Sequence, residues 1–293
     1  MFVSLTKSAA DHMSTSNPSL LQQVSTTPSV SGEHCLLSGY SAWLNGQLLG
    51  SYLGEPNVEQ SNLTLPFNIS HVSTSSENVL VIVHDDTGHD ETSGALNPRG
   101  ILGATLMSDS SSVNFSQWRV TGTAGGETNL DPMRGPYNEG GLYAERMGWH
   151  LPGFKDNAWV DAGSQLNFTG ADIKFYRTVT PLSIPEGVDV SISFELSACG
   201  TTNAFRAQLF VNGYQMGRFN PYVGNQIEFP VPPGILDYKG DNTIGFSLWA
   251  QTEAGACASV DWKINYVLES SLDVTFDGEY LRPGWTSERL QYS

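Results

Sequence analysis

The sequence has little of what several classes of protein require. Only 14 of its 293 residues are Lys or Arg, against 30 Asp and Glu, so the net charge is −16. Such a chain repels nucleic acid and anionic membrane surfaces, because both carry negative charge. It also lacks any run of about 18 apolar residues, the length that a membrane-spanning helix needs. The sequence therefore predicts no nucleic-acid and no membrane partner, and it remains compatible with a neutral ligand such as a sugar.

Helical periodicity and the familiar catalytic motifs are also missing. One short turn of helix is expected at residues 144–147, and no longer window repeats apolar residues at helical spacing. The chain contains no G-x-S-x-G, H-E-x-x-H, phosphate-loop or dinucleotide-binding pattern. No cofactor is predicted from these patterns.

Two polar segments are weak candidates for chemistry. Glu139 follows Asn138, as in the acid/base residue of many sugar hydrolases, but it lacks the second carboxylate that a retaining enzyme needs. Residues 84–91 hold two His and four acidic side chains that could bind a cation, although their spacing does not match an EF-hand. A surface loop and a polar turn are the preferred interpretations. We therefore predict no catalytic residue and no metal.

Cysteine is scarce, with three residues and no C-x-x-C pair. This spacing excludes the usual zinc and thioredoxin-like sites. Cys199 ends one apolar strand and Cys257 lies just past another, so a disulfide between them is plausible, and Cys35 would be left over.

Signals for location point in two directions. Four glycosylation sequons favour a secretory protein, and they begin at Asn62, Asn68, Asn114 and Asn167. Residues 1–17 nevertheless lack the apolar core and cleavage site of a signal peptide. The chain is therefore either cytoplasmic or a piece of a larger secreted protein, and we favour the second interpretation.

The most informative feature that is present is an internal repeat. Residues 42–50 and 208–217 both consist of an apolar strand, an Asn-Gly turn and a second strand that soon reaches Gly. An Asn-Gly pair between such strands is a strong hairpin signal, because both turn residues need positive φ. Asn78 lies 33 residues after Asn45 of the first turn, and Asn242 lies 30 residues after Asn212 of the second. Each of these two asparagines precedes an apolar strand. The sequence thus predicts two copies of one all-β unit.

Turn signals between many short strands favour sandwiches. The predicted organisation is a disordered or atypical leader (1–34), a first sandwich (35–122), a Gly/Pro-rich connection (123–160), a second sandwich (161–270) and a tail (271–293). Trp43, Trp249 and Trp262 lie on predicted strands and are expected in the cores. Tyr143 and Trp149 lie in the connection and are better candidates for contact with a ligand or another domain.

Several segments together resemble a known family. These are residues 99–104, 118–127, 134–146, 175–178, 210–219 and 280–290, within a likeness that runs from about Gly39 to Ser293. The chain resembles the C-terminal part of fungal β-galactosidases of glycoside hydrolase family 35. In that family, secreted enzymes remove terminal β-linked galactose by a retaining mechanism. An N-terminal barrel carries both catalytic Glu residues, and two jelly-roll domains pack against it.

The resemblance implies a fold and a role. It implies an all-β chain of two galactose-binding-like jelly-roll β-sandwich domains, without the catalytic barrel. Residues 1–37 do not look like the opening strands of the first jelly roll, which predicts that this sandwich is incomplete. The implied role is to brace the barrel, the expected partner, and to contact galactose-containing carbohydrate, in an enzyme that is extracellular.

Seven loop residues are predicted to make these contacts: Tyr137, Asn138, Glu139, Tyr143, Glu145, Arg146 and Trp149. Two alternatives remain. An autonomous carbohydrate-binding module would present exposed, coplanar aromatic rings on one sandwich face. A truncated gene product without activity is the other alternative.

Overall fold

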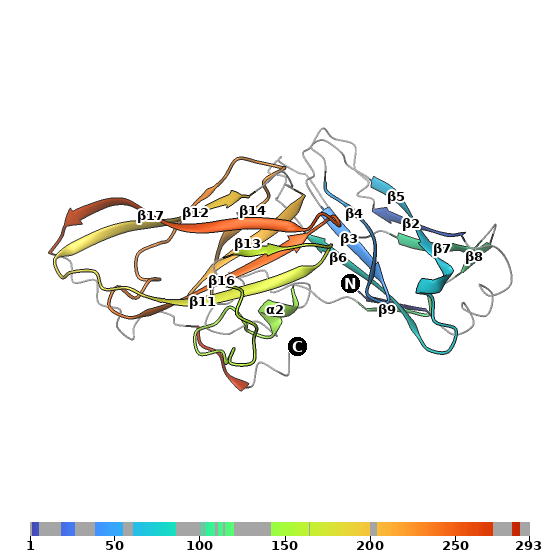
Figure 1. Ribbon diagram of the computed structural model, residues 1–293, viewed down its shortest axis with the longest axis horizontal. Coiled ribbons are helices and arrows are strands. Elements are labelled where there is room, and N and C mark those ends of the chain that lie inside the picture. Colours follow the sequence, from blue (N-terminus) through green and yellow to red (C-terminus); the bar gives the residue numbers. More distant parts are fainter. Residues whose placement is uncertain are drawn as a thin grey trace, which may run out of the picture. The chain divides into compact units, whose positions relative to one another are not determined.

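The computed structural model (Figure 1) describes residues 2–5, 19–26, 39–54, 61–85, 101, 103–108, 111–113, 115–119, 142–163, 165–199, 204–271 and 283–287. The chain divides into two compact units, Met1–Thr121 and Gly122–Ser293. In the described ranges, strands dominate and only two short helices occur. Neither helix approaches the length and apolarity of a membrane span. The predicted all-β class is confirmed.

The second unit is built from two antiparallel sheets. One has the strand order β10-β17-β12-β15 and the other β11-β16-β13-β14. When these eight strands are renumbered from one to eight, the orders become 1-8-3-6 and 2-7-4-5, the arrangement of a jelly roll. The strands are β10 (Leu166–Phe168), β11 (Ile173–Pro181), β12 (Val188–Ala198), β13 (Phe205–Val211), β14 (Tyr214–Phe219), β15 (Glu228–Pro230), β16 (Asp241–Ala250) and β17 (Ala256–Glu269).

The core of the second unit lies between these sheets. Phe194 and Leu196 of β12 face Leu209 of β13 and Phe246 of β16, and all four side chains are almost fully buried. Gly217 of β14 is required by this packing, because a Cβ there would lie 2.2 Å from the ring of Phe229. Burial of aromatic and aliphatic side chains between the sheets is the main source of stability for such a fold.

The first unit repeats the same plan. Its sheets have the orders β4-β3-β6-β1-β9 and β5-β2-β7-β8. Strands β1, β6, β3 and β4 take the places of β11, β16, β13 and β14, while β5, β2 and β7 take those of β15, β12 and β17. The elements are β1 (Phe2–Leu5), β2 (Ser19–Thr26), β3 (Gly39–Leu44), β4 (Gln47–Tyr52), β5 (Ser61–Asn68), the 3₁₀ helix η1 (Ile69–His71), β6 (Asn78–Asp85), β7 (Gly103–Ser108), β8 (Ser111–Val113) and β9 (Gln117–Arg119).

The predicted leader, residues 1–34, requires a correction. We expected it to be disordered or atypical and the first sandwich to be incomplete, but β1 pairs with β6 and β9, and β2 lies between β5 and β7. β1 and β2 are the equivalents of β11 and β12, the second and third strands of the second jelly roll. The prediction failed because β2 is rich in Ser, Thr and Gln and lacks clean alternation. Pairing with neighbouring strands decides its conformation more than intrinsic propensity does.

A hydrogen-bond network around Asn45 joins the turn between β3 and β4 to the start of β6 in the first unit. Asn45 has φ of 50° and begins the predicted Asn-Gly turn. Its Nδ2 donates to the carbonyl of His71 and to Oδ1 of Asn78, at 2.8 Å each. Its Oδ1 accepts from the amide of Val79 at 2.8 Å. Oδ1 of Asn78 also accepts from the amide of Ser73 at 2.6 Å.

The same network recurs in the second unit. Nδ2 of Asn212 donates to the carbonyl of Ile235 at 2.7 Å and to Oδ1 of Asn242 at 2.8 Å. Oδ1 of Asn212 accepts from the amide of Thr243 at 2.8 Å. Oδ1 of Asn242 accepts from the amide of Asp237 at 2.7 Å. Because the two networks match bond for bond, they confirm that the chain holds two copies of one unit. We call each network the asparagine lock.

Candidate functional site

Residues 142–160 form a cap on the outer face of the β11-β16-β13-β14 sheet. The cap begins with the helix α2 (Tyr143–Arg146), which coincides with the predicted turn of helix. His150 is fully buried, and its ring lies 5.0 Å from that of Phe210 on β13. A Cβ on Gly245 of β16 would come within 3.5 Å of the His150 backbone. The cap therefore rests closely on the sheet, so this part of the predicted connection belongs structurally to the second unit.

Specific polar contacts hold the cap in place. Nη1 of Arg177 on β11 donates to the carboxylate of Asp156 at 2.6 Å, and its Nη2 donates to the Leu151 carbonyl at 3.3 Å. The Trp285 backbone amide donates to the Pro152 carbonyl at 2.9 Å, and its indole Nε1 donates to the Met147 carbonyl at 3.1 Å. A residue far along the chain thus holds the middle of the cap at two points, Met147 and Pro152.

The cap carries an aromatic cluster, which we define as Tyr143, Trp149, Phe154, Trp159 and Trp285. Its rings meet at steep angles: 89° between Tyr143 and Trp149, 72° between Trp149 and Trp159, and 80° between Phe154 and Trp285. Edge-to-face packing suits a small hydrophobic core. It does not make the flat platform that an autonomous sugar-binding module was expected to show.

Tyr143 is the open part of this cluster, because 54% of its surface is exposed. The guanidinium of Arg146 lies 5.9 Å from the Tyr143 ring centroid, in a cation–π contact. Desolvation lowers the pKa of Arg146, and the neighbouring Tyr143 and Glu145 partly oppose this shift. The guanidinium remains charged at neutral pH, since an arginine side chain does not deprotonate in this range.

The structure brings four of the seven predicted contact residues together. Tyr143, Glu145 and Arg146 lie on α2, and Trp149 follows in the next turn. Glu145 is only 3% exposed, so its side chain does not reach the surface. The other three predicted residues, Tyr137, Asn138 and Glu139, lie outside the described residues.

The three tryptophans expected in the cores differ in burial. Trp249 is 3% exposed, as predicted, whereas Trp43 is only partly buried and belongs to neither core cluster of the first unit. Trp262 is 37% exposed, although its ring lies 4.4 Å from that of Phe194. The prediction that Trp262 is a core residue was therefore wrong in part. Its ring contacts the core at Phe194, but it lies at the margin of the core.

Sequence reasoning missed a buried polar cluster on the same sheet as the cap. Nε of Arg206 donates to Oε1 of Gln251 at 3.2 Å, and the Tyr222 hydroxyl donates to the same oxygen at 2.8 Å. The Arg206 guanidinium lies 5.7 Å from the Tyr222 ring centroid and 6.0 Å from that of Trp249. The available signal was an Arg near the start of β13, a strand of mainly apolar residues.

A comparison with known families now decides the relationship. Residues 14–90 and 143–254 match the family described as the β-galactosidase second all-beta domain, with one stretch in each unit. The chain belongs to this family.

Fungal proteins named probable β-galactosidase B are close relatives of this chain. It is 87% identical over 255 residues to a probable β-galactosidase B of Talaromyces marneffei, covering 87% of this chain and 25% of the relative. It is 61% identical over 265 residues to a probable β-galactosidase B of Neosartorya fischeri, covering 87% and 26% respectively. The chain therefore spans about a quarter of the length of these relatives.

Among solved structures, the apo form of a Pleurotus ostreatus lectin aligns with 92% of this chain and 82% of its own. The TM-score is 0.22 and the identity 14%. A score this low supports neither a shared fold nor a shared ligand.

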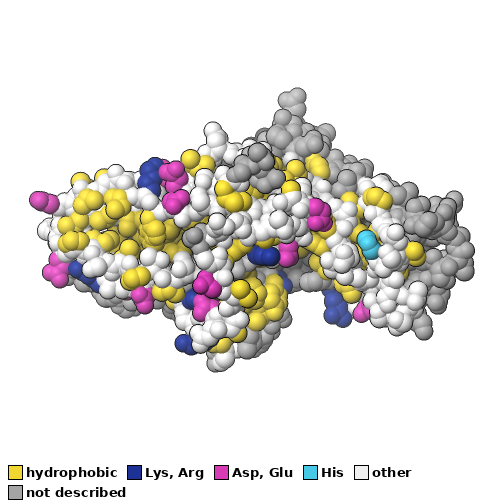
Figure 2. Space-filling model, viewed as in Figure 1, with side chains coloured by type: hydrophobic (Ala, Val, Ile, Leu, Met, Phe, Trp, Pro, Cys, Tyr) yellow, Lys and Arg dark blue, Asp and Glu magenta, His cyan; other side chains and the backbone are white. Residues whose placement is uncertain are grey.

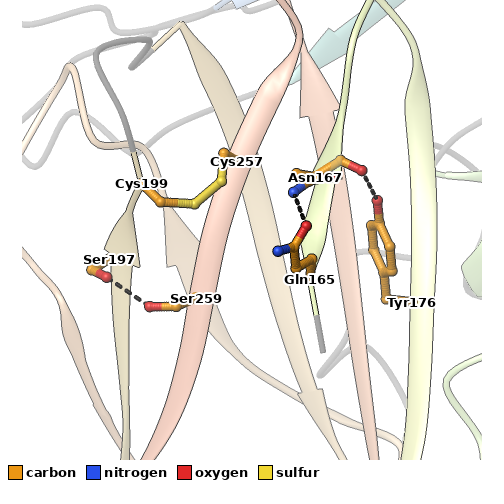
Figure 3. The surroundings of a disulfide bond; sticks show 7 residues. All are labelled: Gln165, Asn167, Tyr176, Ser197, Cys199, Cys257 and Ser259. Carbon is orange, nitrogen blue, oxygen red and sulfur yellow. Dashed lines mark hydrogen bonds between the residues drawn. A yellow bond between two sulfur atoms is a disulfide. The ribbon is translucent and has the colours of Figure 1, made fainter. Parts of the chain in front are cut away.

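A disulfide joins Cys199 and Cys257 in this β-galactosidase domain, with Cα atoms 5.2 Å apart (Figure 3). It links the end of β12 to the start of β17. The hydroxyls of Ser197 and Ser259 lie 2.7 Å apart on the same pair of strands. Cys35 lies outside the described residues. The pairing that the sequence made plausible is thus present.

The predicted glycosylation sites differ in what the structure describes. Asn167 on β10 is exposed and its Nδ2 donates to Gln165, as Figure 3 shows. Asn68 is also exposed, and its side chain accepts from the Ser70 amide at the start of η1. Asn62 lies on β5, whereas Asn114 falls outside the described ranges.

The candidate cation segment, residues 84–91, is described only at His84 and Asp85. Across the described part of the chain, no three His, Cys, Asp or Glu side chains gather to hold a metal ion.

Proposed function

We propose that this chain is the non-catalytic jelly-roll part of a β-galactosidase, in which it braces the catalytic barrel. The observation that carries the proposal is its close similarity to one quarter of the length of fungal probable β-galactosidases B. Of the two carboxylates that the loop sequence offers, Glu145 is buried in the cap, and Glu139 lies outside the described residues.

Hydrolysis of a chromogenic β-galactoside tests this proposal. The purified chain is expected to give no turnover above a buffer blank, while the intact Talaromyces marneffei relative serves as positive control. Turnover at enzyme-like rates would overturn the proposal. Glu139→Gln and Glu145→Gln would then show which carboxylate is responsible.

Contact with galactose-containing carbohydrate is a second candidate function, supported by the open Tyr143 ring and the neighbouring Arg146. An aromatic face beside a cation and hydrogen-bond donors suits a sugar ring. Calorimetric titration with a β-galacto-oligosaccharide should detect binding that Tyr143→Ala abolishes. Val160→Ala is the matched control, because Val160 is 92% exposed on the same cap. Equal binding by Tyr143→Ala would exclude this site.

We propose further that the parent enzyme is extracellular, since Asn68 and Asn167 are exposed sequon residues. Fused to a secretion signal in a fungal host, the chain should carry glycans at both positions. Peptide mass spectrometry before and after glycan removal measures this. Two unmodified asparagines in the secreted chain would count against the proposal.

A further inference from the structure

Among the described strands, one edge of β17 has no neighbour along most of its length. This strand pairs with β12 from Ala258 to Glu269, but β10 pairs with it only at Ala256, Cys257 and Ala258. Among the strands that the structure describes, residues 260–269 therefore have a neighbour on one side only. A long unpaired edge is a template for further contact, and soluble proteins usually protect such edges.

Hydrophobic core surface continues onto this open edge. In the β12–β17 pairing, Trp262 lies opposite Phe194, and Ile264 lies opposite Ile192. Directly opposed residues point to the same face of a sheet. Phe194 and Ile192 belong to the buried core, whereas Trp262 is 37% and Ile264 65% exposed. The core layer is thus uncovered where it reaches β17.

Val267 extends this surface, since it lies opposite the core residue Val190 and is 57% exposed. We call Trp262, Ile264 and Val267 the open core edge. Figure 2 shows hydrophobic side chains gathered over the end of the second unit where β17 and β12 lie in Figure 1. An apolar patch of this kind marks an interaction surface in a soluble protein.

The chemistry of the open core edge suits a protein surface better than a sugar. Ile264 and Val267 offer dispersion contacts but no hydrogen bonds, whereas sugar sites combine an aromatic face with several polar groups. Two polar side chains of β17 are engaged with neighbouring strands: Lys263 bonds Glu228 at 2.5 Å, and Asn265 bonds Ser193 at 2.6 Å. Apolar residues free of competing charge are typical of the centre of a protein interface.

We propose that the open core edge is the surface on which the remainder of the parent β-galactosidase docks. This inference rests on the proposed function and adds to it the place of contact. The docking partner is the part of the enzyme that corresponds to the unmatched length of the relatives, which is about three quarters of their chain. The docked segment is apolar and pairs with the free backbone edge of residues 260–269.

The test uses the whole chain and, expressed separately, the part of the Talaromyces marneffei relative that the match leaves out. Calorimetry measures the Kd of the complex, and hydrogen exchange follows the amides of residues 260–269. Ile264→Lys should weaken binding about tenfold or more, as expected for a residue central to an interface. Ile227→Lys is the matched control, because Ile227 is 45% exposed beside β15, at the opposite edge of the same sheet.

The proposal is supported when the wild-type chain binds and its amides at residues 260–269 exchange more slowly in the complex. Ile264→Lys should lose both effects, and Ile227→Lys should keep them. Equal affinity for all three chains overturns it and leaves the proposed function intact. No complex with the wild-type chain also overturns it, and the galactoside assay then decides the proposed function separately. The proposal is also overturned if the chain alone forms a dimer that Ile264→Lys dissociates. Protection of residues 260–269 in the free chain overturns it too. In both cases a different occupant covers the edge.

Discussion

Asn242 shows how much structure one side chain can organise. It is fully buried, its Oδ1 accepts from Asn212 and from the Asp237 amide, and its Nδ2 donates to the carbonyls of Asp237 and Gly240. Asn78 does the equivalent work in the first unit. An amide side chain is suited to this position, since it offers donors and acceptors together.

Replacing Asn242 with Ala should destabilise the second unit by about 2–4 kcal/mol, because buried partners lose their hydrogen bonds. Denaturant unfolding followed by tryptophan fluorescence measures the loss. Asn265→Ala is the control, since Asn265 bonds two serines from an exposed position. A change below about 1 kcal/mol for Asn242→Ala would contradict the structural role assigned to the asparagine lock.

Gly217→Ala should cost about 1–3 kcal/mol through overpacking, because the added methyl collides with the Phe229 ring. Thermal unfolding is the measurement. Gly224→Ala provides the comparison, since a Cβ at Gly224 meets no atom within 4 Å. Similar melting temperatures for the two variants would be inconsistent with the packing described.

At the residue scale, the asparagine pairs could be predicted in part. Asn45, Asn78, Asn212 and Asn242 stand out in the sequence through their repeated spacing, although the bonds between them do not. The need for Gly217 could not be predicted, because it depends on a ring brought in from β15. The partial exposure of Trp262 was likewise invisible, since strand periodicity does not say where the facing sheet ends.

Among the elements, β15 and β17 share an ion pair on the outer face of their sheet. Lys263 bonds the Glu228 carboxylate at 2.5 Å and lies 3.9 Å from Glu195. The hydrogen bond from Lys263 lowers the pKa of Glu228, and the same bond raises the pKa of Lys263. Both side chains are substantially exposed, so solvent screens the pair.

The pH dependence of this pair has a definite sign. Glu228 has a lowered pKa, so its contribution to stability is full above the ordinary glutamate pKa of about 4.3 and is lost as the pH falls below it. Lys263 has a raised pKa, so its contribution is full below the ordinary lysine pKa of about 10.4 and is lost above it. The pair therefore stabilises the protein in the window between these values.

Glu228→Gln should lower the melting temperature slightly and by a constant amount between roughly pH 5.5 and pH 9.5. The difference from the wild-type chain should shrink at lower pH, since both chains then lack the charge. Added salt should shrink it as well. Melting curves across this range provide the test, and a difference that grows toward low pH would contradict it.

Elements with strong local signals could be predicted, and elements that depend on neighbours could not. The Asn-Gly hairpins β3–β4 and β13–β14 and the short helix α2 were expected. Strands β1 and β2 were not, because β1 is only four residues long, β2 is rich in Ser, Thr and Gln, and both pair with strands far along the chain. For the same reason, part of the predicted connection proved to be a cap, held by partners as distant as Trp285.

On the scale of the whole molecule, the two units provide an internal comparison. Only the second contains a disulfide among the described residues. The bond closes a loop of 58 residues in sequence separation, and constraints of this size typically contribute about 2–4 kcal/mol.

Reduction of Cys199–Cys257 should therefore lower the stability of the second unit and leave the first unit unchanged. Hydrogen exchange resolved by peptide, with and without a reductant, separates the two responses. Cys199→Ser should reproduce the effect of the reductant. Equal destabilisation of both units would show that the disulfide does not act locally.

Prediction at this scale had a different basis. The repeat in the sequence indicated two all-β units, but the jelly-roll topology came from the family resemblance. Strand order depends on contacts between residues far apart in the chain, such as Leu166 with Ala258. Local periodicity does not predict such contacts.

The place of β17 in its sheet also has a consequence for biosynthesis. The last strand of the second unit lies between β10 and β12, two of the strands made earliest in that unit. During translation the β10–β17–β12 sheet cannot close until β17 has been made, about 100 residues after β10 begins, or roughly 5–20 s at ordinary elongation rates. The first unit is complete by then. The nascent second unit thus passes through a stage with its core exposed, when protection by chaperones matters most.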